Sequence, residues 1–382
     1  MVCLQIGVNT IQTKMKTTKV TKNPMLNNYS QFIFNLFKKN ETHLHELNYL
    51  FWECTLRCNL QCLHCGSDCK TDNITKDLPF EDFLQAILPL KKAYKRDSIT
   101  VAITGGEPLL REDLPQCGRK LRENGFRWGI VTNGYGYTPE VHKKLLTSGM
   151  GSITVSLDGL EPTHNWLRAN NQSFAKAVDA LSLITSSKRL IYDVVTCVNK
   201  KNINELEALK ELLISKQVSA WRLFTISPIG RAAPEAAHND DFCLNPQELK
   251  QLMDFIVMSR NDKRIKVSFS CEAYLGKYER KARDSFFFCR AGIQVASVLI
   301  DGSISACPNI NRSFIQGNIY KDDFLDVWNN RFKIMRDRRW TKTGICKNCA
   351  AYKNCNGGAL HLWNEKKDEI MTCIYANLSK QN

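Results

Sequence analysis

Short apolar segments of strand length alternate with longer segments of helical periodicity through much of the chain. Six strand-like segments occur, at residues 47–53, 98–104, 126–132, 152–157, 190–198 and 220–226. Strands that alternate with helices through right-handed crossovers form a parallel sheet covered by helices. The alternation therefore predicts an α/β fold. Six units are too few for a complete eight-unit barrel, so a partial barrel and a doubly wound sheet both remain open.

Local patterns support this reading at three helices. Phe80, Phe83, Leu84 and Ile87 repeat at helical spacing after the first strand segment. Asn202 and Glu205 have the spacing of a capping box ahead of a leucine-rich helix. The segment 245–248 combines a capping residue, a proline in the first turn and a glutamate, which predicts another helix start.

The pattern divides the chain into three parts. After about residue 264 the alternation gives way to short apolar runs, turns and cysteines, which predicts a small, metal-stapled domain at 265–382 after a barrel at 46–264. Residues 1–24 carry four lysines and no acidic residue. We expect the whole segment 1–45 to be a basic leader and lead-in, and 1–24 to be disordered.

Composition narrows the functional classes. The 382 residues carry a net charge of +15, a balance that suits nucleic acid, a membrane surface or a small anion. The basic residues form no stripe interleaved with aromatics, so nucleic acid is not predicted as a partner. No apolar run reaches the roughly 18 residues of a membrane span, and no secretory signal is recognisable, so we expect a cytoplasmic protein.

Five of the 16 cysteines lie between Cys54 and Cys69. Cys58, Cys62 and Cys65 form a Cys-x3-Cys-x2-Cys series after the first strand segment, at the mouth where parallel α/β sheets place their ligand sites. Three thiolates can hold three irons of a four-iron cluster and leave the fourth open. A zinc site completed by Cys54 or Cys69 remains possible on spacing alone. We otherwise expect these two thiols to be structural.

The ends of the next strand segments carry polar residues. Gly105, Gly106 and Glu107 follow the second, and their carbonyls and carboxylate suit an ammonium group. Ser156 and Asp158 end the fourth and suit ribose hydroxyls, and Arg168 suits a carboxylate.

These motifs, in this order, resemble the radical S-adenosylmethionine (SAM) superfamily over roughly residues 47–235. The resemblance implies a partial (β/α)6 TIM-like barrel and a [4Fe–4S] cluster on Cys58, Cys62 and Cys65. It also implies that SAM binds the open iron, with its ammonium at Gly105, Gly106 and Glu107 and its ribose at Ser156. Asp158 and Arg168 complete the expected contacts, Arg168 on the SAM carboxylate. An electron donor such as flavodoxin or ferredoxin is a further expectation.

The second cysteine group has the spacing Cys289-x12-Gly302-x4-Cys307, Cys346-x2-Cys349-x5-Cys355 and a final Cys373. It resembles the SPASM extension of radical SAM enzymes, in a subfamily encoded beside small lipoproteins. The resemblance implies one auxiliary [4Fe–4S] cluster on Cys346, Cys349, Cys355 and Cys373. Cys289 and Cys307 would belong to a second, but Ala359 stands where the family has a cysteine. Cys271 and His361 are candidate substitutes, and a zinc ribbon is the alternative.

We therefore expect a radical SAM enzyme that acts on a peptide or protein, including one associated with a lipoprotein. A small substrate such as a porphyrin-type intermediate is one alternative, and a zinc-stapled basic binding module without catalysis is another. Substrate is expected between the two domains, near the positive charge of Arg222 and Arg231.

Overall fold

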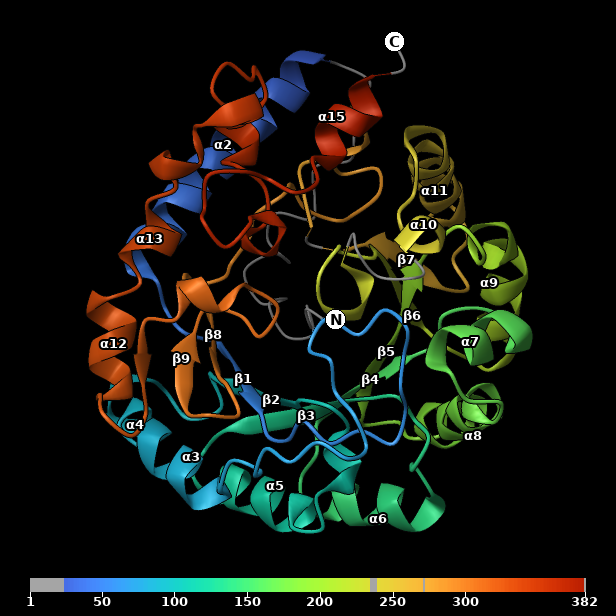
Figure 1. Ribbon diagram of the computed structural model, residues 1–382, viewed down its shortest axis with the longest axis vertical. Helices are drawn as coiled ribbons and strands as arrows, with labels where there is room; N and C mark the ends of the chain where they lie inside the picture. The colour runs from blue at the N-terminus through green and yellow to red at the C-terminus, as the bar shows by residue number, and fades with distance from the viewer. Residues whose placement is uncertain (1–23, 234–238, 271, 381–382) are drawn as a thin grey trace.

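The computed structural model describes residues 24–233, 239–270 and 272–380 (Figure 1). The predicted disorder of residues 1–24 falls outside these residues except for Pro24, and Cys271 lies outside them as well. The chain winds around a curved sheet, with most helices on its outer side.

A single sheet of ten strands runs in the order β10-β9-β8-β1-β2-β3-β4-β5-β6-β7. Neighbouring strands from β1 to β7 are parallel, β8 pairs parallel to β1, and β9 and β10 are antiparallel additions. The strands are β1 Tyr49–Glu53, β2 Thr100–Thr104, β3 Arg127–Thr132, β4 Ser152–Ser156, β5 Ile191–Val198, β6 Ala220–Thr225, β7 Lys266–Phe269, β8 Val295–Val298, β9 Ser303–Ser305 and β10 Gly317–Asn318.

This topology confirms the α/β fold and decides between the two architectures. A doubly wound sheet reverses its strand order at a switch point, whereas β1 to β6 lie in chain order. The sheet begins with β10 and ends with β7, so its two edges are not paired and the barrel is partial. All six predicted strand segments are strands, with ends within two residues of prediction.

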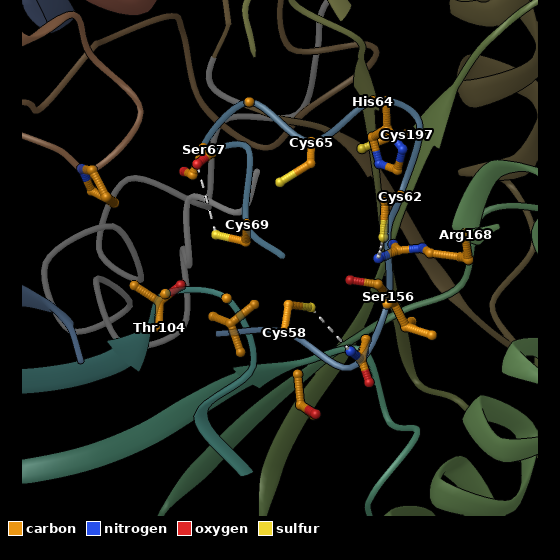
Figure 2. A pocket seen from close by; sticks show the side chains of 18 of the residues that line it. Cys58, Cys62, His64, Cys65, Ser67, Cys69, Thr104, Ser156, Arg168 and Cys197 are labelled. Atoms are coloured by element: carbon orange, nitrogen blue, oxygen red, sulfur yellow. Dashed lines mark hydrogen bonds between the residues drawn. The ribbon is translucent and has the colours of Figure 1, made fainter. Parts of the chain in front are cut away.

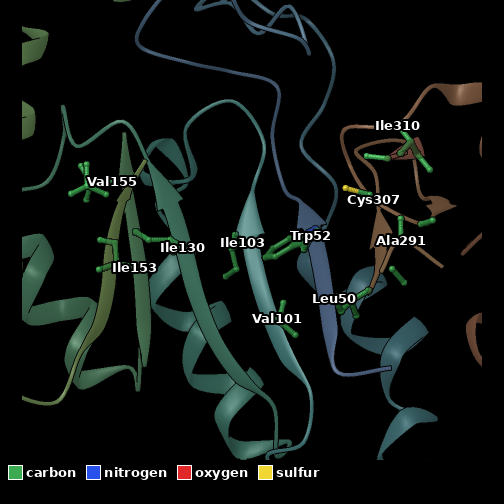
Figure 3. Packing of buried hydrophobic residues seen from close by; sticks show 14 of the residues in the cluster. Leu50, Trp52, Val101, Ile103, Ile130, Ile153, Val155, Ala291, Cys307 and Ile310 are labelled. Atoms are coloured by element: carbon green, nitrogen blue, oxygen red, sulfur yellow. The ribbon is translucent and has the colours of Figure 1, made fainter. Parts of the chain in front are cut away.

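Apolar side chains on both faces of the strands explain why the sheet is buried. Leu50, Trp52 and Val101 belong to the large core beneath the outer helices (Figure 3). Phe51 and Val195 belong to a smaller cluster on the opposite face. Strands buried on both faces are typical of parallel sheets in α/β proteins.

The helices of the described ranges lie mostly on the outer side of the sheet. They are α2 Pro24–Leu44, α3 Phe80–Ile87, α4 Leu90–Ala93, α5 Leu114–Glu123, α6 Pro139–Thr147, α7 Glu161–Arg168, α8 Ser173–Thr185, α9 Leu206–Ser215, α10 Asn239–Phe242, α11 Pro246–Ser259, α12 Phe324–Asn330, α13 Lys333–Arg336, α14 Tyr352–Cys355 and α15 Ile374–Ser379. The four predicted apolar residues of α3 are its buried residues, as expected. None of the helices in the described ranges combines the length and apolarity needed to cross a membrane.

Helix α2 occupies residues 24–44, which is most of the lead-in expected between the segment 1–24 and the first strand. Phe34 packs its ring against Phe286 and Phe288, and Lys38 Nζ donates to the carbonyl of Asn354 at 2.9 Å. These apolar and polar contacts hold the helix against the C-terminal part of the chain.

The sheet also runs across residue 264, where the sequence suggests a domain boundary. β7 extends the sheet beyond β6, and β8 adds to it beside β1. A division into 46–264 and 265–382 stays a prediction, but both parts share one sheet.

Candidate active site

The loop after β1 places three predicted thiols around one space. Figure 2 shows Cys58, Cys62 and Cys65 there, together with Cys69. The loop closes on itself because the backbone N–H of Cys58 donates to the carbonyl of Lys70 at 3.1 Å. A cavity of about 130 Å³ is lined by all four cysteines and reaches the ends of β2, β3 and β4. The predicted motif is therefore assembled at the mouth of the barrel.

Burial controls the ionisation of these thiols. It raises the pKa of Cys58 to about 12, and it also raises the pKa of Cys62, although Arg168 opposes that shift. Cys65 differs because a hydrogen bond from the Cys69 thiol lowers its pKa to about 5. Thiols that stay protonated when buried become thiolates when a metal replaces their protons. A set of soft sulfur donors in a small cavity fits an iron–sulfur cluster.

Gly105 and Gly106 let the end of β2 approach the cysteine loop. A Cβ atom on Gly105 would lie 2.2 Å from the carbonyl oxygen of Thr55, and one on Gly106 would lie 2.1 Å from that of Arg57. The backbone N–H of Gly106 donates to Thr55 at 2.8 Å. Both glycines line the cavity, and both are required by this contact within the chain itself.

Glu107 differs from the expectation that its side chain faces an ammonium group. Its buried carboxylate accepts hydrogen bonds from Leu109 N–H, Thr132 Oγ1 and Asn133 N–H, at 3.1, 2.8 and 2.8 Å. Burial raises its pKa to about 7, against these three donors. The side chain thus ties the end of β2 to the end of β3, and it is not part of the cavity wall.

Asp158 and Arg168 form a buried ion pair beside Ser156. Arg168 Nη2 lies 2.5 Å from Asp158 Oδ2, and Asp158 Oδ1 accepts from the backbone N–H of Cys197 at 2.8 Å. Burial opposes ionisation of Asp158, but Arg168 and two nearby histidines lower its pKa to about 2. Arg168 Nη1 also contacts Cys62 Sγ at 3.5 Å. Ser156, Asp158 and Arg168 all line the cavity, although the Asp158 carboxylate is also engaged by Arg168 and by Cys197 N–H.

The two arginines expected near substrate have other partners. Arg222 forms a buried ion pair with Asp193 inside the sheet. Arg231 lines the cavity, but its Nε donates to the carbonyl of Cys62 at 2.8 Å and its Nη1 to that of Cys69 at 3.0 Å. Arg231 therefore holds the cysteine loop in place rather than presenting free charge.

Sequence reasoning missed several residues of the cavity wall, among them His64 and Cys69. His64, between the motif cysteines, lines the cavity, and burial lowers its pKa to about 3. Cys69 lines the cavity as well, where the sequence suggested a structural thiol. Its distance along the chain from Cys65 gave no signal, because the return of the loop to Cys58 is a tertiary feature. Cys54 is fully buried outside the cavity, in agreement with a structural role.

Four C-terminal cysteines also lie together. Burial and then the neighbouring thiols Cys349 and Cys373 raise the pKa of Cys346 to about 11. Burial raises the pKa of Cys355 to about 12, and Cys373 and Cys346 add to the shift. The four predicted auxiliary ligands are therefore near enough to raise one another's pKa.

Cys289 and Cys307 lie at two separate places in the structure. Cys307 is buried in the apolar core near Ile310, as Figure 3 shows. Cys289 lines a separate cavity, together with Cys355. Ala359 is buried and its backbone N–H donates to Glu272. His361 lines yet another cavity, and burial lowers its pKa to about 4.

Comparison with protein families decides the class. Residues 52–213 match the radical SAM superfamily, and residues 289–350 match SPASM, described as an iron–sulfur cluster-binding domain. The chain is a radical SAM enzyme with a C-terminal SPASM domain. The cofactors of this class are a [4Fe–4S] cluster and SAM, with auxiliary iron–sulfur clusters in the SPASM domain.

Relatives of this radical SAM enzyme have different named functions. An AdoMet-dependent heme synthase of Methanosarcina barkeri is 24% identical over 85% of this chain and 95% of its own. The mycofactocin maturase MftC of Mycolicibacterium smegmatis is 28% identical over 81% of this chain and 77% of its own.

Two solved structures share the fold. Streptococcus suis SuiB bound to precursor peptide SuiA has a TM-score of 0.63 and 16% identity, over 90% of this chain and 79% of its own. Native anSMEcpe with bound AdoMet and a Cp18Cys peptide has a TM-score of 0.65 and 20% identity, over 88% and 95%.

A second, larger cavity of about 560 Å³ adjoins the cysteine cavity of this radical SAM enzyme. Glu53, Gly66, Ser67, Pro308 and Asn309 line both. Its remaining wall comes from both sides of residue 264, including Ile229 and Trp363. The two cavities together connect the cysteine loop to the C-terminal part of the chain.

Proposed function

We propose that this enzyme cleaves SAM reductively and removes a hydrogen atom from a peptide or protein substrate. The observation that carries the proposal is the second cavity, which meets the cysteine cavity at Glu53. A substrate group placed there lies beside the site that Cys58, Cys62 and Cys65 surround.

The residues that would hold the cofactors follow from the geometry. We assign the [4Fe–4S] cluster to Cys58, Cys62 and Cys65, the SAM ammonium to the backbone of Gly105 and Gly106, and the ribose to Ser156. When bound, this pair of cofactors supplies a 5′-deoxyadenosyl radical by one-electron cleavage of a carbon–sulfur bond.

The surrounding chain positions these groups. Arg168 orients the Cys62 sulfur, and Arg231 fixes the loop backbone on both sides of Cys65. Arg168 is also charge-neutralised by Asp158, so it reaches the thiol without leaving an unpaired buried charge.

The C-terminal thiols suggest one auxiliary cluster, which makes two clusters in the whole enzyme. We assign one auxiliary cluster to Cys346, Cys349, Cys355 and Cys373, whose thiols affect one another. Cys289 and Cys307 supply only two of the four ligands that a second auxiliary cluster needs, so we propose that this second cluster is absent. Membership of the lipoprotein-associated subfamily remains a prediction.

The wall of the second cavity favours a peptide over a porphyrin. Its ionisable lining includes Glu53 and Glu365, while Arg312 is already paired with Asp301. A porphyrin-type intermediate carries several carboxylates, which these acidic side chains would repel. The heme synthase relative keeps that substrate class as the second candidate.

Co-expression with candidate substrates tests the proposal. Each small protein encoded beside this enzyme is produced with it and analysed by mass spectrometry. A mass change that disappears in the Cys58→Ala variant supports a peptide substrate. Turnover of a porphyrin-type compound, with no change in any peptide, contradicts it.

A further inference from the structure

The cavity that Cys289 and Cys355 line has a volume of about 290 Å³ and lies between α2 and the C-terminal region. It shares no lining residue with the cysteine cavity or with the second cavity. Its ionisable lining is basic apart from the thiols Cys289 and Cys355, and consists of Lys38, Lys39, Arg336, Arg338 and Lys353. No carboxylate belongs to this described lining. We call these five side chains and their cavity the basic cavity.

The basic side chains are held by neutral partners. Lys38 Nζ donates to the carbonyl of Asn354, Arg336 Nε to that of Gly292 at 2.9 Å, and Arg338 Nε to that of Met335 at 2.7 Å. Within the described ranges, none of the five forms an ion pair with a carboxylate. Lys39 and Lys353 are exposed, whereas Lys38 is buried.

The carboxylate that acts most on Lys38 has its own partners. Glu279 accepts from the backbone N–H groups of Leu275 and Phe287 and lies 3.8 Å from Arg283. Burial lowers the pKa of Lys38 to about 8 and that of Arg336 to about 10.

Cys355 links the basic cavity to the proposed auxiliary cluster. Cys355 lines the basic cavity and is one of four thiols assigned to the auxiliary cluster under the proposed function. A cluster on these thiols would therefore border the basic cavity at Cys355. Opposite charge on a partner speeds encounter and sets its orientation, most strongly at low salt.

We propose that the basic cavity is the docking surface for an acidic electron-carrier protein of the flavodoxin or ferredoxin class. This inference rests on the proposed function, since it uses the auxiliary cluster. A reduced carrier docked there would give up one electron, and a cluster held by Cys346, Cys349, Cys355 and Cys373 would gain it. No bond forms or breaks in this step.

Charge reversal at the rim tests the proposal on the complete reconstituted enzyme. The variant Lys39→Glu/Lys353→Glu changes two exposed residues, and Lys39→Gln/Lys353→Gln removes their charge with less perturbation. The control is Lys91→Glu/Lys92→Glu on α4, which is exposed and lies apart from α2 (Figure 1). Stopped-flow absorbance follows cluster reduction by a reduced ferredoxin, and dithionite serves as a reductant that needs no docking.

The expected result is a fall of about tenfold or more in the ferredoxin rate for the rim Glu variant at low salt. The Gln variant should lie between it and the wild type, and the difference should shrink at high salt. The control and the dithionite rates should stay within about twofold of wild type.

Two results would overturn the docking surface. They are an unchanged ferredoxin rate in the rim Glu variant and an equal loss in the α4 control. If the rate is unchanged and the rim Glu variant no longer binds inorganic phosphate, the basic cavity is a site for a small anion. A wild-type chain without the auxiliary iron–sulfur signal would instead contradict the proposed function.

Discussion

The buried pair Asp158–Arg168 allows a prediction with a definite size and pH dependence. The two side chains are 1% and 10% exposed, so water does little to screen either charge. Replacing Arg168 by Met removes the partner and leaves the Asp158 carboxylate buried. Breaking a buried ion pair on one side costs about 3–5 kcal/mol of unfolding free energy. We expect a loss in this range at pH 8.

The loss should become smaller as the pH falls. In the wild type the pKa of Asp158 is about 2, below its ordinary value of 3.8, so the contribution of the pair is constant above about pH 5 and is lost toward pH 2. In Arg168→Met the largest opposing influence is gone, so burial raises the pKa of Asp158 above its unfolded value, against the remaining Cys197 N–H donor and the two histidines. A carboxyl whose pKa is raised in the folded state destabilises the protein at high pH, and this destabilisation disappears as the pH falls through the raised pKa. The variant should therefore recover part of its loss between pH 8 and pH 5.

Urea unfolding of the reconstituted protein, followed anaerobically at pH 8 and pH 5, measures both quantities. The double variant Arg168→Met/Asp158→Asn carries no charge at either position. It should be more stable than Arg168→Met at pH 8 and should lack its pH dependence. A loss that is equal at both pH values, or a double variant as unstable as the sum of the single changes, would refute the reasoning.

Three further predictions concern the cysteine sites. Gly106→Ala places a Cβ atom 2.1 Å from the Arg57 carbonyl, so it should lower the free energy of unfolding by about 1–3 kcal/mol and lower cluster retention. The control Gly136→Ala, whose nearest contact is 3.9 Å, should do neither. Equal iron content in the two variants would contradict this prediction. Arg231→Ala should lower substrate turnover and uncoupled SAM cleavage to the same extent, because Arg231 holds the loop; a selective loss of substrate turnover would restore its role as a substrate anchor. Reconstituted enzyme should contain about eight irons per chain. A content of about twelve irons, of which about four are lost in Cys289→Ala/Cys307→Ala, would show that other groups complete a third cluster.

The strands could be predicted closely from the sequence because each is a short apolar run buried on both faces. The same holds for the helix start at Asn245, whose side chain accepts from Glu248 N–H at 2.9 Å in a complete capping box. The similar pattern at Asn202 was misleading. Its side chain is buried and donates instead to the carbonyls of Asp158 and Cys197, so a tertiary contact replaces the cap.

The sequence predicted which residues lie at the site better than it predicted what their side chains contact. The glycines at 105 and 106 were expected to admit a ligand, yet the closest atoms to their missing side chains belong to Thr55 and Arg57. Glu107 was expected to face cofactor, but it accepts from Thr132 and Asn133 and lies outside the cavity wall, whereas Asp158 lines the cavity and also pairs with Arg168. Such pairings depend on which strand ends meet in space, and the sequence pattern of one strand carries no information about its neighbour.

The central claim is that Cys58, Cys62 and Cys65 form the site of SAM cleavage, separate from the C-terminal thiols. The most direct test is to measure 5′-deoxyadenosine and iron together in the anaerobically reconstituted wild type and in the Cys58→Ala/Cys62→Ala/Cys65→Ala variant. We predict 5′-deoxyadenosine from the wild type alone, while the variant keeps about four irons in its C-terminal cluster. Continued production of 5′-deoxyadenosine by the triple variant would contradict the claim.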